Sequence, residues 1–136
     1  MSDLTAQFAA DCNAPLHPKA IEGLGLFNSG HYFEAHEALE AAWREETGPV
    51  RDLYRGILQV AVVYLHITRC NYPGAVKVYR RSLRWLNLWP ETCRGVSVHL
   101  LRQNLETVIQ EVHTLGPDHL EAFDRSLLKP VKYAKT

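Results

Sequence analysis

The fold is decided by a stretch in the middle of the chain, residues 55–67, which reads RGILQVAVVYLHI. Wound into a helix of about 3.6 residues per turn, these residues are apolar on almost every side, which is typical of a helix enclosed by other elements. Turn residues mark both ends, since Gly-Pro precedes the stretch at 48–49 and Asn-Tyr-Pro-Gly follows it at 71–74. We therefore expect a central apolar helix over 49–70.

Prolines divide the remainder of the chain into segments of helical length. The seven prolines lie between periodic stretches or at their first turn, which is where helical proteins tolerate proline. No stretch alternates apolar and polar residues with a period of two, so we expect no sheet. Because short joints favour antiparallel neighbours, the sequence predicts an all-α fold of five to six antiparallel helices, a bundle of repeat-like helical hairpins around the central helix. The expected helices are 18–29, 32–46, 49–70, 73–88, 97–115 and 117–127.

Length and composition are those of one globular domain. The chain has 136 residues, of which 46% are hydrophobic and 22% charged, and this mix excludes a disordered chain. We treat 1–136 as a single helical domain with a motif-bearing core at 18–89 and C-terminal helices at 97–127. The end of the chain, 129–136, is predicted to be a mobile basic tail.

The net charge, the hydropathy and the cysteines of the chain indicate which kinds of partner and which cellular location to expect. Fifteen Lys and Arg residues balance fifteen Asp and Glu residues, and a net charge of zero disfavours a nucleic-acid partner. No apolar run reaches the roughly 18 residues that a membrane span needs, and the first residues lack the pattern of a signal peptide. We therefore predict a cytoplasmic protein without a membrane partner. Its three widely spaced cysteines, Cys12, Cys70 and Cys93, are expected to be free thiols.

Polar residues on the central helix fall close to one line and need partners. In an antiparallel pair joined near 47–48, residues at one level have numbers that sum to about 95. This register sets His36 level with Gln59, and it sets Glu40 level with Arg55 one helical turn away. We predict a polar seam between helices 32–46 and 49–70, with a largely buried His36 bonded to Gln59 and with Glu40 in an ion pair with Arg55.

The next helix carries a basic stripe. Lys77, Arg80, Arg81 and Arg84 follow helical spacing, and the joint near 71–72 sets Arg84 level with Gln59. An arginine that meets the polar seam would suit an anionic ligand. A solvated basic face without a ligand is the preferred interpretation, and the ligand site is the alternative.

The stretch FNSGHYFEAHEALEAAW at 27–43, followed by YRGILQVAVVYLH at 54–66 and NYPGA at 71–75, resembles a known family. It is similar to the domain of unknown function 309 family, whose pattern is F-N-x-G-x-Y-F-x-A-H-E-x-L-E-x-x-W. The resemblance runs from about 27 to 86 and implies a small all-helical intracellular protein with no established activity. Arg55 stands where such sequences often carry glutamine. The residues that the resemblance carries over are Asn28, Gly30, Tyr32, His36, Glu37, Glu40, Trp43, Gly56, Gln59, His66 and Ala75.

Three interpretations of these polar residues stay open. The first is a structural seam that fixes helix register. The second is a divalent metal site with His36, Glu40 and His66 as ligands, which would make the protein a metal-assisted hydrolase with Glu37 as general base, although no cofactor is the preferred expectation.

The third interpretation is a pocket for a small molecule or a protein partner. We predict an uncharacterised binding or interaction module, leave open whether it is an enzyme, and assign no catalytic residue. A homo-oligomer formed through the apolar residues Trp85, Leu88 and Trp89 is a further alternative. The candidate site residues are His36, Glu37, Glu40, Arg55, Gln59, His66 and Arg84.

Overall fold

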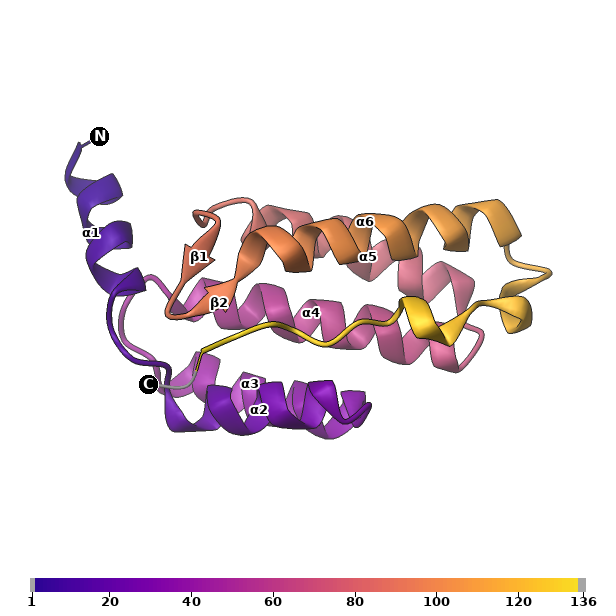
Figure 1. Ribbon diagram of the computed structural model, residues 1–136, viewed down its shortest axis with the longest axis horizontal. Helices are drawn as coiled ribbons and strands as arrows, with labels where there is room; N and C mark the ends of the chain where they lie inside the picture. Colours follow the sequence, from indigo (N-terminus) through magenta and orange to yellow (C-terminus); the bar gives the residue numbers. More distant parts are fainter. Residues whose placement is uncertain (1, 135–136) are drawn as a thin grey trace.

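The computed structural model describes residues 2–134, with side chains from residue 7 onward. It confirms the all-α class, because the described residues form six α-helices and one pair of very short strands (Figure 1). The helices are α1 (Ser2–Cys12), α2 (Pro18–Asn28), α3 (Tyr32–Glu45), α4 (Arg51–Thr68), α5 (Tyr72–Leu86) and α6 (Val98–Leu115). The strands are β1 (Thr92–Cys93) and β2 (Val96–Ser97), and the 3₁₀ turns η1 (Leu120–Ala122) and η2 (Arg125–Leu127) follow α6.

The enclosed helix is α4, as the apolar stretch predicts. Figure 1 shows it between a layer formed by α2 and α3 and a layer formed by α5 and α6, with successive helices running in opposite directions. Leu53, Ile57, Val60 and Tyr64 on α4 are fully buried. Burial of this kind contributes about 1.5–3 kcal/mol for each large apolar side chain, so α4 organises the core.

Two glycines set how closely the helices approach. A Cβ atom on Gly56 would lie 2.9 Å from Leu86 Cδ2 and 3.3 Å from the Leu86 backbone nitrogen, so any larger residue would force Leu86 to shift where α4 meets α5. Likewise a Cβ atom on Gly23 would lie 2.7 Å from Leu39 Cγ, where α2 meets α3. Because α4 and α5 pack closely at Gly56, the α4 side chains next to this glycine can contact residues at the C-terminal end of α5.

Three local expectations are wrong. The helix α1 was not expected, because its sequence has only a weak apolar pattern; Phe8 nevertheless stacks on Trp89 with ring centroids 4.8 Å apart. The expected helix over 117–127 is replaced by η1 and η2, since Phe123 (φ −59°, ψ 131°) and Asp124 (φ −77°, ψ 102°) are extended and interrupt the segment. The expected absence of a sheet fails at residues 92–97, where Arg94 and Gly95 both have positive φ and form a tight hairpin turn.

The prediction of free thiols is also wrong for two of the three cysteines. Cys12 at the end of α1 forms a disulfide with Cys93 of β1, across a sequence separation of 81 residues. Only Cys70 is a free thiol among the described residues, and it is exposed. No local pattern could reveal the pair, because the two cysteines lie far apart in the sequence and are neighbours only in the folded arrangement.

The C-terminal segment is ordered through residue 134, which corrects the expectation of a mobile tail. The side chain of Asn28 accepts the Val131 N–H at 2.7 Å and donates to the Val131 carbonyl at 2.9 Å. The Ser97 N–H then donates to the Lys132 carbonyl at 2.9 Å, which extends the small sheet. Val131 is 2% exposed, so the segment belongs to the core, whereas residues 135–136 lie outside the described part.

The helices were also compared with the requirements of a bilayer. Within residues 2–134, no helix combines the length and apolar character that crossing a membrane requires.

Candidate functional site

A cationic cavity of about 450 Å³ opens between α4 and α5, and we call it the arginine pocket. Arg84 and Gln59, the two residues that the helix register sets at one level, both line it. The buried side of α5 includes Ala75, Ser82 and Leu86, so its basic residues are held on the other side of the helix. The lining residues are Arg55, Gln59, Arg80, Arg81, Arg84 and Trp85.

Guanidinium and indole groups alternate across this part of the molecule. The Arg55 guanidinium carbon lies 4.2 Å from the centroid of the Trp85 ring and 5.4 Å from that of Trp43. Arg51 lies 4.8 Å from the Trp43 ring, and Arg84 lies 5.4 Å from the Trp85 ring. Each such contact contributes about 0.5–2 kcal/mol, and together they hold Arg55 in one place between α3 and α5.

The four arginines of the pocket have no acidic partner among the side chains that the structure describes. Among the side chains of residues 7–134, no carboxylate lies within 4.0 Å of the guanidinium nitrogens of Arg55, Arg80, Arg81 or Arg84. Arg80, Arg81 and Arg84 are exposed, whereas Arg55 is half-buried. The pocket therefore concentrates positive charge in a protein whose net charge is zero.

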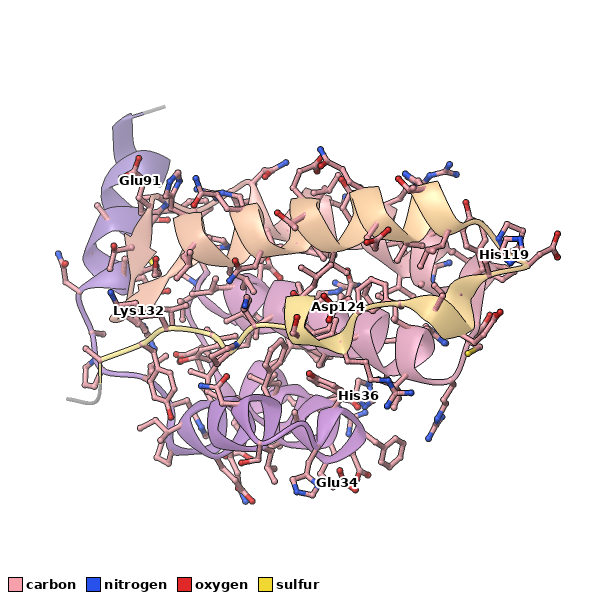
Figure 2. The ribbon with its side chains drawn as sticks, turned by 45° about the vertical axis from the view of Figure 1, so that its right-hand side comes forward. Glu34, His36, Glu91, His119, Asp124 and Lys132 are labelled. Atoms are coloured by element: carbon pink, nitrogen blue, oxygen red, sulfur yellow. A yellow bond between two sulfur atoms is a disulfide. The ribbon has the colours of Figure 1, made fainter. Side chains whose placement is uncertain are left out.

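A second cavity of about 220 Å³ adjoins the first and shares Arg55 and Gln59 with it. We call it the seam cavity, because His36, Glu40, Arg55 and Gln59, the residues of the predicted polar seam, all line it. Its other lining residues are Trp43 and Leu58. Figure 2 shows His36 on the side of α3 that faces α4, whereas Glu34 points outward. The four residues of the predicted seam thus lie around one cavity in the structure.

The contacts predicted within the seam are wrong. Arg44 Nη2 donates to Glu40 Oε1 at 2.7 Å, so the ion pair of Glu40 is formed along α3 and not with Arg55. His36 Nε2 lies 3.8 Å from Glu40 Oε2, and no hydrogen bond joins His36 to Gln59 among the described side chains. The His36 side chain is 30% exposed, which is half-buried and not largely buried. Stacking on two indoles keeps the Arg55 guanidinium away from the carboxylate.

Gln59 has an unused acceptor as a result. Its Oε1 atom is buried and has no hydrogen-bond partner among residues 7–134. A buried acceptor without a partner costs about 1–3 kcal/mol. The side-chain oxygen of Gln59 therefore forms no hydrogen bond that would hold α3 against α4.

His66 belongs to another part of the molecule. Its Nδ1 atom lies 3.1 Å from Asn71 Nδ2 at the turn between α4 and α5, and burial together with the charge of Arg69 lowers the pKa of the imidazole. Residues 7–134 contain no group of three or more His, Cys, Asp or Glu side chains that could hold a metal ion. The predicted ligand set of His36, Glu40 and His66 is therefore not assembled, and Glu37 is exposed on α3.

The chain was compared with known proteins. A model of the family described as Domain of unknown function (DUF309) matches residues 20–78. The Uncharacterized protein YpuF of Bacillus subtilis (strain 168) is 30% identical over an alignment of 125 positions, and the match covers 88% of this chain and 68% of that protein. The chain belongs to the DUF309 family. An uncharacterized protein of Aquifex aeolicus (strain VF5) is 26% identical over 99 residues, and the match covers 70% of this chain but 29% of that protein.

Several residues of the DUF309 pattern have structural contacts in this chain. Asn28 binds the C-terminal segment through Val131, and Gly56 admits α5. Gly30 takes a φ of 81° in the turn between α2 and α3. The Tyr32 ring packs edge-on against Phe27 at a centroid distance of 5.4 Å. The pattern therefore describes the architecture of the DUF309 fold as much as its chemistry.

The DUF309 match ends inside α5 and covers only part of the arginine pocket. Arg55 and Gln59 lie within residues 20–78, whereas Arg80, Arg81 and Arg84 lie beyond them. Sequence reasoning noted these basic residues as a stripe but missed the two indoles that position Arg55. The same level counting could have found them, because Trp85 lies one position before Leu86, the neighbour of Gly56.

Proposed function

We propose that this DUF309 protein is a binding module that holds a small anionic ligand in the arginine pocket. The observation that carries the proposal is the group of four guanidinium groups without a carboxylate within 4.0 Å among residues 7–134. Gathered like charges repel one another unless solvent or a counter-ion offsets them. An anion in the pocket would supply that counter-charge through charge-assisted hydrogen bonds.

The size and order of the pocket support a small ligand. Its volume of about 450 Å³ is within the range of small-molecule sites. Arg55 is already fixed by stacking on Trp85 and Trp43, so less side-chain entropy is lost when it binds. The Gln59 Oε1 atom, which has no partner among residues 7–134, accepts only from a donor group, so it contributes specificity toward a ligand N–H or O–H and no attraction for the anion.

The location and the nature of the partner are part of the same proposal. A small-molecule ligand in the cytoplasm remains our prediction. The disulfide between Cys12 and Cys93 bears on this point, because disulfides are rare in a reducing compartment. The disulfide therefore counts against the predicted cytoplasmic location, and thiol titration of the purified protein tests the disulfide itself.

Thermal unfolding tests the anion site. Sodium pyrophosphate and sodium citrate are added at constant ionic strength to wild type, Arg84→Gln and Lys77→Gln, with sodium chloride as reference. Lys77 is a matched control, since it is exposed on the same helix but does not line the pocket. At an anion concentration of about 100 times Kd, binding stabilises the native state by about 2.7 kcal/mol.

The expected result is a saturable rise in Tm for wild type and Lys77→Gln, and a much smaller rise for Arg84→Gln. The proposal is wrong if neither anion raises Tm above the chloride reference. It is also wrong if the two variants respond alike, because binding would then follow general surface charge.

A further inference from the structure

We infer that the ligand of the arginine pocket carries two or more phosphoryl groups next to an uncharged portion. This inference rests on the proposed function, since it names the class of anion that the pocket would hold. It follows from the type of the cationic groups, from their arrangement on two helices and from the cavity beside them.

The type of cation favours phosphoryl oxygens. All four cationic lining residues are arginines, and Lys77 on the same helix does not line the pocket. A guanidinium presents a planar fork of donors that matches phosphate oxygens in pairs, whereas an ammonium acts as a point charge. A single carboxylate brings one charge, while a phosphate monoester brings about 1.5–2 negative charges at neutral pH. Two phosphoryl groups would therefore balance four arginines.

The arrangement requires an acceptor that can be reached from two sides. Arg55 enters the pocket from α4, and Arg80, Arg81 and Arg84 enter it from α5. Arg80 and Arg84 are one helical turn apart, so their donors are offset along the helix axis. A carboxylate offers two oxygens in one plane, whereas each phosphoryl group offers oxygens in a tetrahedral array and a chain of such groups extends along the axis.

The seam cavity gives the remainder of the ligand a place. It adjoins the arginine pocket at Arg55 and Gln59 and has the apolar surfaces of Trp43 and Leu58 in its lining. Glu40 also lines it, and this carboxylate would repel a second anionic end. The portion of the ligand that lies there therefore carries no negative charge, and the apolar surfaces of Trp43 and Leu58 suit an uncharged group. The same carboxylate disfavours a nucleic-acid strand, whose phosphates would continue past Arg55.

Isothermal titration calorimetry with tripolyphosphate and citrate tests the inference. Both probes are polyanions, and they are titrated at neutral pH and constant ionic strength into the full chain. Wild type should bind tripolyphosphate at least about tenfold more tightly than citrate. Arg84→Gln should weaken tripolyphosphate binding by about tenfold to a hundredfold, because it removes a charge-assisted contact.

Two variants separate the effect of arginine's planar donor geometry from the effect of its positive charge. Arg84→Lys keeps the charge but loses the planar fork, and it should weaken tripolyphosphate binding by about tenfold. Lys77→Gln removes a charge outside the pocket, so tripolyphosphate affinity should stay within about twofold of wild type in physiological salt. Arg84 and Lys77 are both exposed, so these variants should fold.

The outcomes distinguish the two proposals. Equal affinities for tripolyphosphate and citrate, both reduced by Arg84→Gln, would overturn the phosphoryl inference and leave the anion site in place. Failure of both probes to bind would overturn both. A short oligodeoxythymidine that binds more tightly than tripolyphosphate, and is weakened equally by Lys77→Gln and Arg84→Gln, would show a nucleic-acid surface and overturn the inference.

Discussion

Replacing Arg94 by methionine should destabilise the fold more than any exposed substitution. The Arg94 side chain is 5% exposed and joins three segments. Its Nη1 atom donates to Glu46 Oε1 at 2.7 Å, to Tyr54 Oη at 3.1 Å and to the Pro15 carbonyl at 3.1 Å. Nε donates to the Asp11 carbonyl at 2.7 Å, and Nη2 forms an ion pair with the Asp11 carboxylate. Arg94 therefore fastens α1 and the β-hairpin to the joint between α3 and α4.

The magnitude follows from the groups that methionine would leave unpaired. Removing one partner of a buried ion pair costs about 3–5 kcal/mol. The Asp11 and Glu46 side chains are each 15% exposed, so solvent screens them only slightly and the loss should be about 3 kcal/mol or more. A domain of this size is stable by about 5–15 kcal/mol, so the variant should still fold.

Urea denaturation monitored by tryptophan fluorescence measures this loss. Arg69→Met is the matched control, because Arg69 is exposed at the end of α4, and it should change stability by less than about 0.5 kcal/mol. Adding Asp11→Asn and Glu46→Gln to Arg94→Met should restore part of the stability, since both unpaired charges are then gone. A loss below about 1 kcal/mol for Arg94→Met would refute the network as a buried clamp.

Three further results are expected. Thiol titration of unreduced, denatured protein should find Cys70 alone, because Cys12 and Cys93 are paired, and reduction should lower stability by about 2–4 kcal/mol; three reactive thiols before reduction would contradict the disulfide. Burial lowers the pKa of His66 below its ordinary 6.5, so the stability that the neutral imidazole contributes above that pH is lost as the pH falls. The variant His66→Gln should therefore lose less stability than wild type between about pH 7 and 5. Equal pH profiles of stability from denaturant melts of the two proteins would contradict this. Trp85→Leu should reduce tripolyphosphate affinity by about tenfold in calorimetry by freeing a stacked guanidinium, and unchanged affinity would separate the indole from binding.

Local signals in the sequence were sufficient for the central helices. Expected segments 32–46, 49–70 and 73–88 correspond to α3, α4 and α5 with ends displaced by up to two residues, because proline and glycine fix where each begins. Helix α1 could not be predicted in this way. Its residues 2–12 are held in place by a disulfide and an aromatic stack to segments that follow about 80 residues later.

The tail shows the same limit. Its basic composition suggests a solvated end, yet Asn28 holds Val131 across a separation of 103 residues. A side-chain amide that replaces a strand neighbour leaves no periodic signal in either segment. Only the folded arrangement of α2 beside the C-terminal segment reveals the contact.

The polar seam was predictable in position but not in bonding. Counting levels across a short antiparallel joint sets His36, Glu40, Arg55 and Gln59 around one cavity, and the structure does the same. The count cannot tell which partner each group chooses. Glu40 forms its ion pair with Arg44, one turn along the same helix. The Arg55 guanidinium stacks on the two indole rings of Trp43 and Trp85. Competition of this kind depends on side-chain geometry that residue spacing does not contain.

Anion binding in the arginine pocket can be observed at single residues by NMR of the arginine Nε–Hε groups. Tripolyphosphate is titrated into isotope-labelled protein at constant ionic strength, and each resonance is assigned by substitution. Saturable shifts are expected for Arg55, Arg80, Arg81 and Arg84, while Arg69 and Arg102, which do not line the pocket, remain unchanged. Absence of any shift, or equal shifts at all arginines, would contradict anion binding in the pocket.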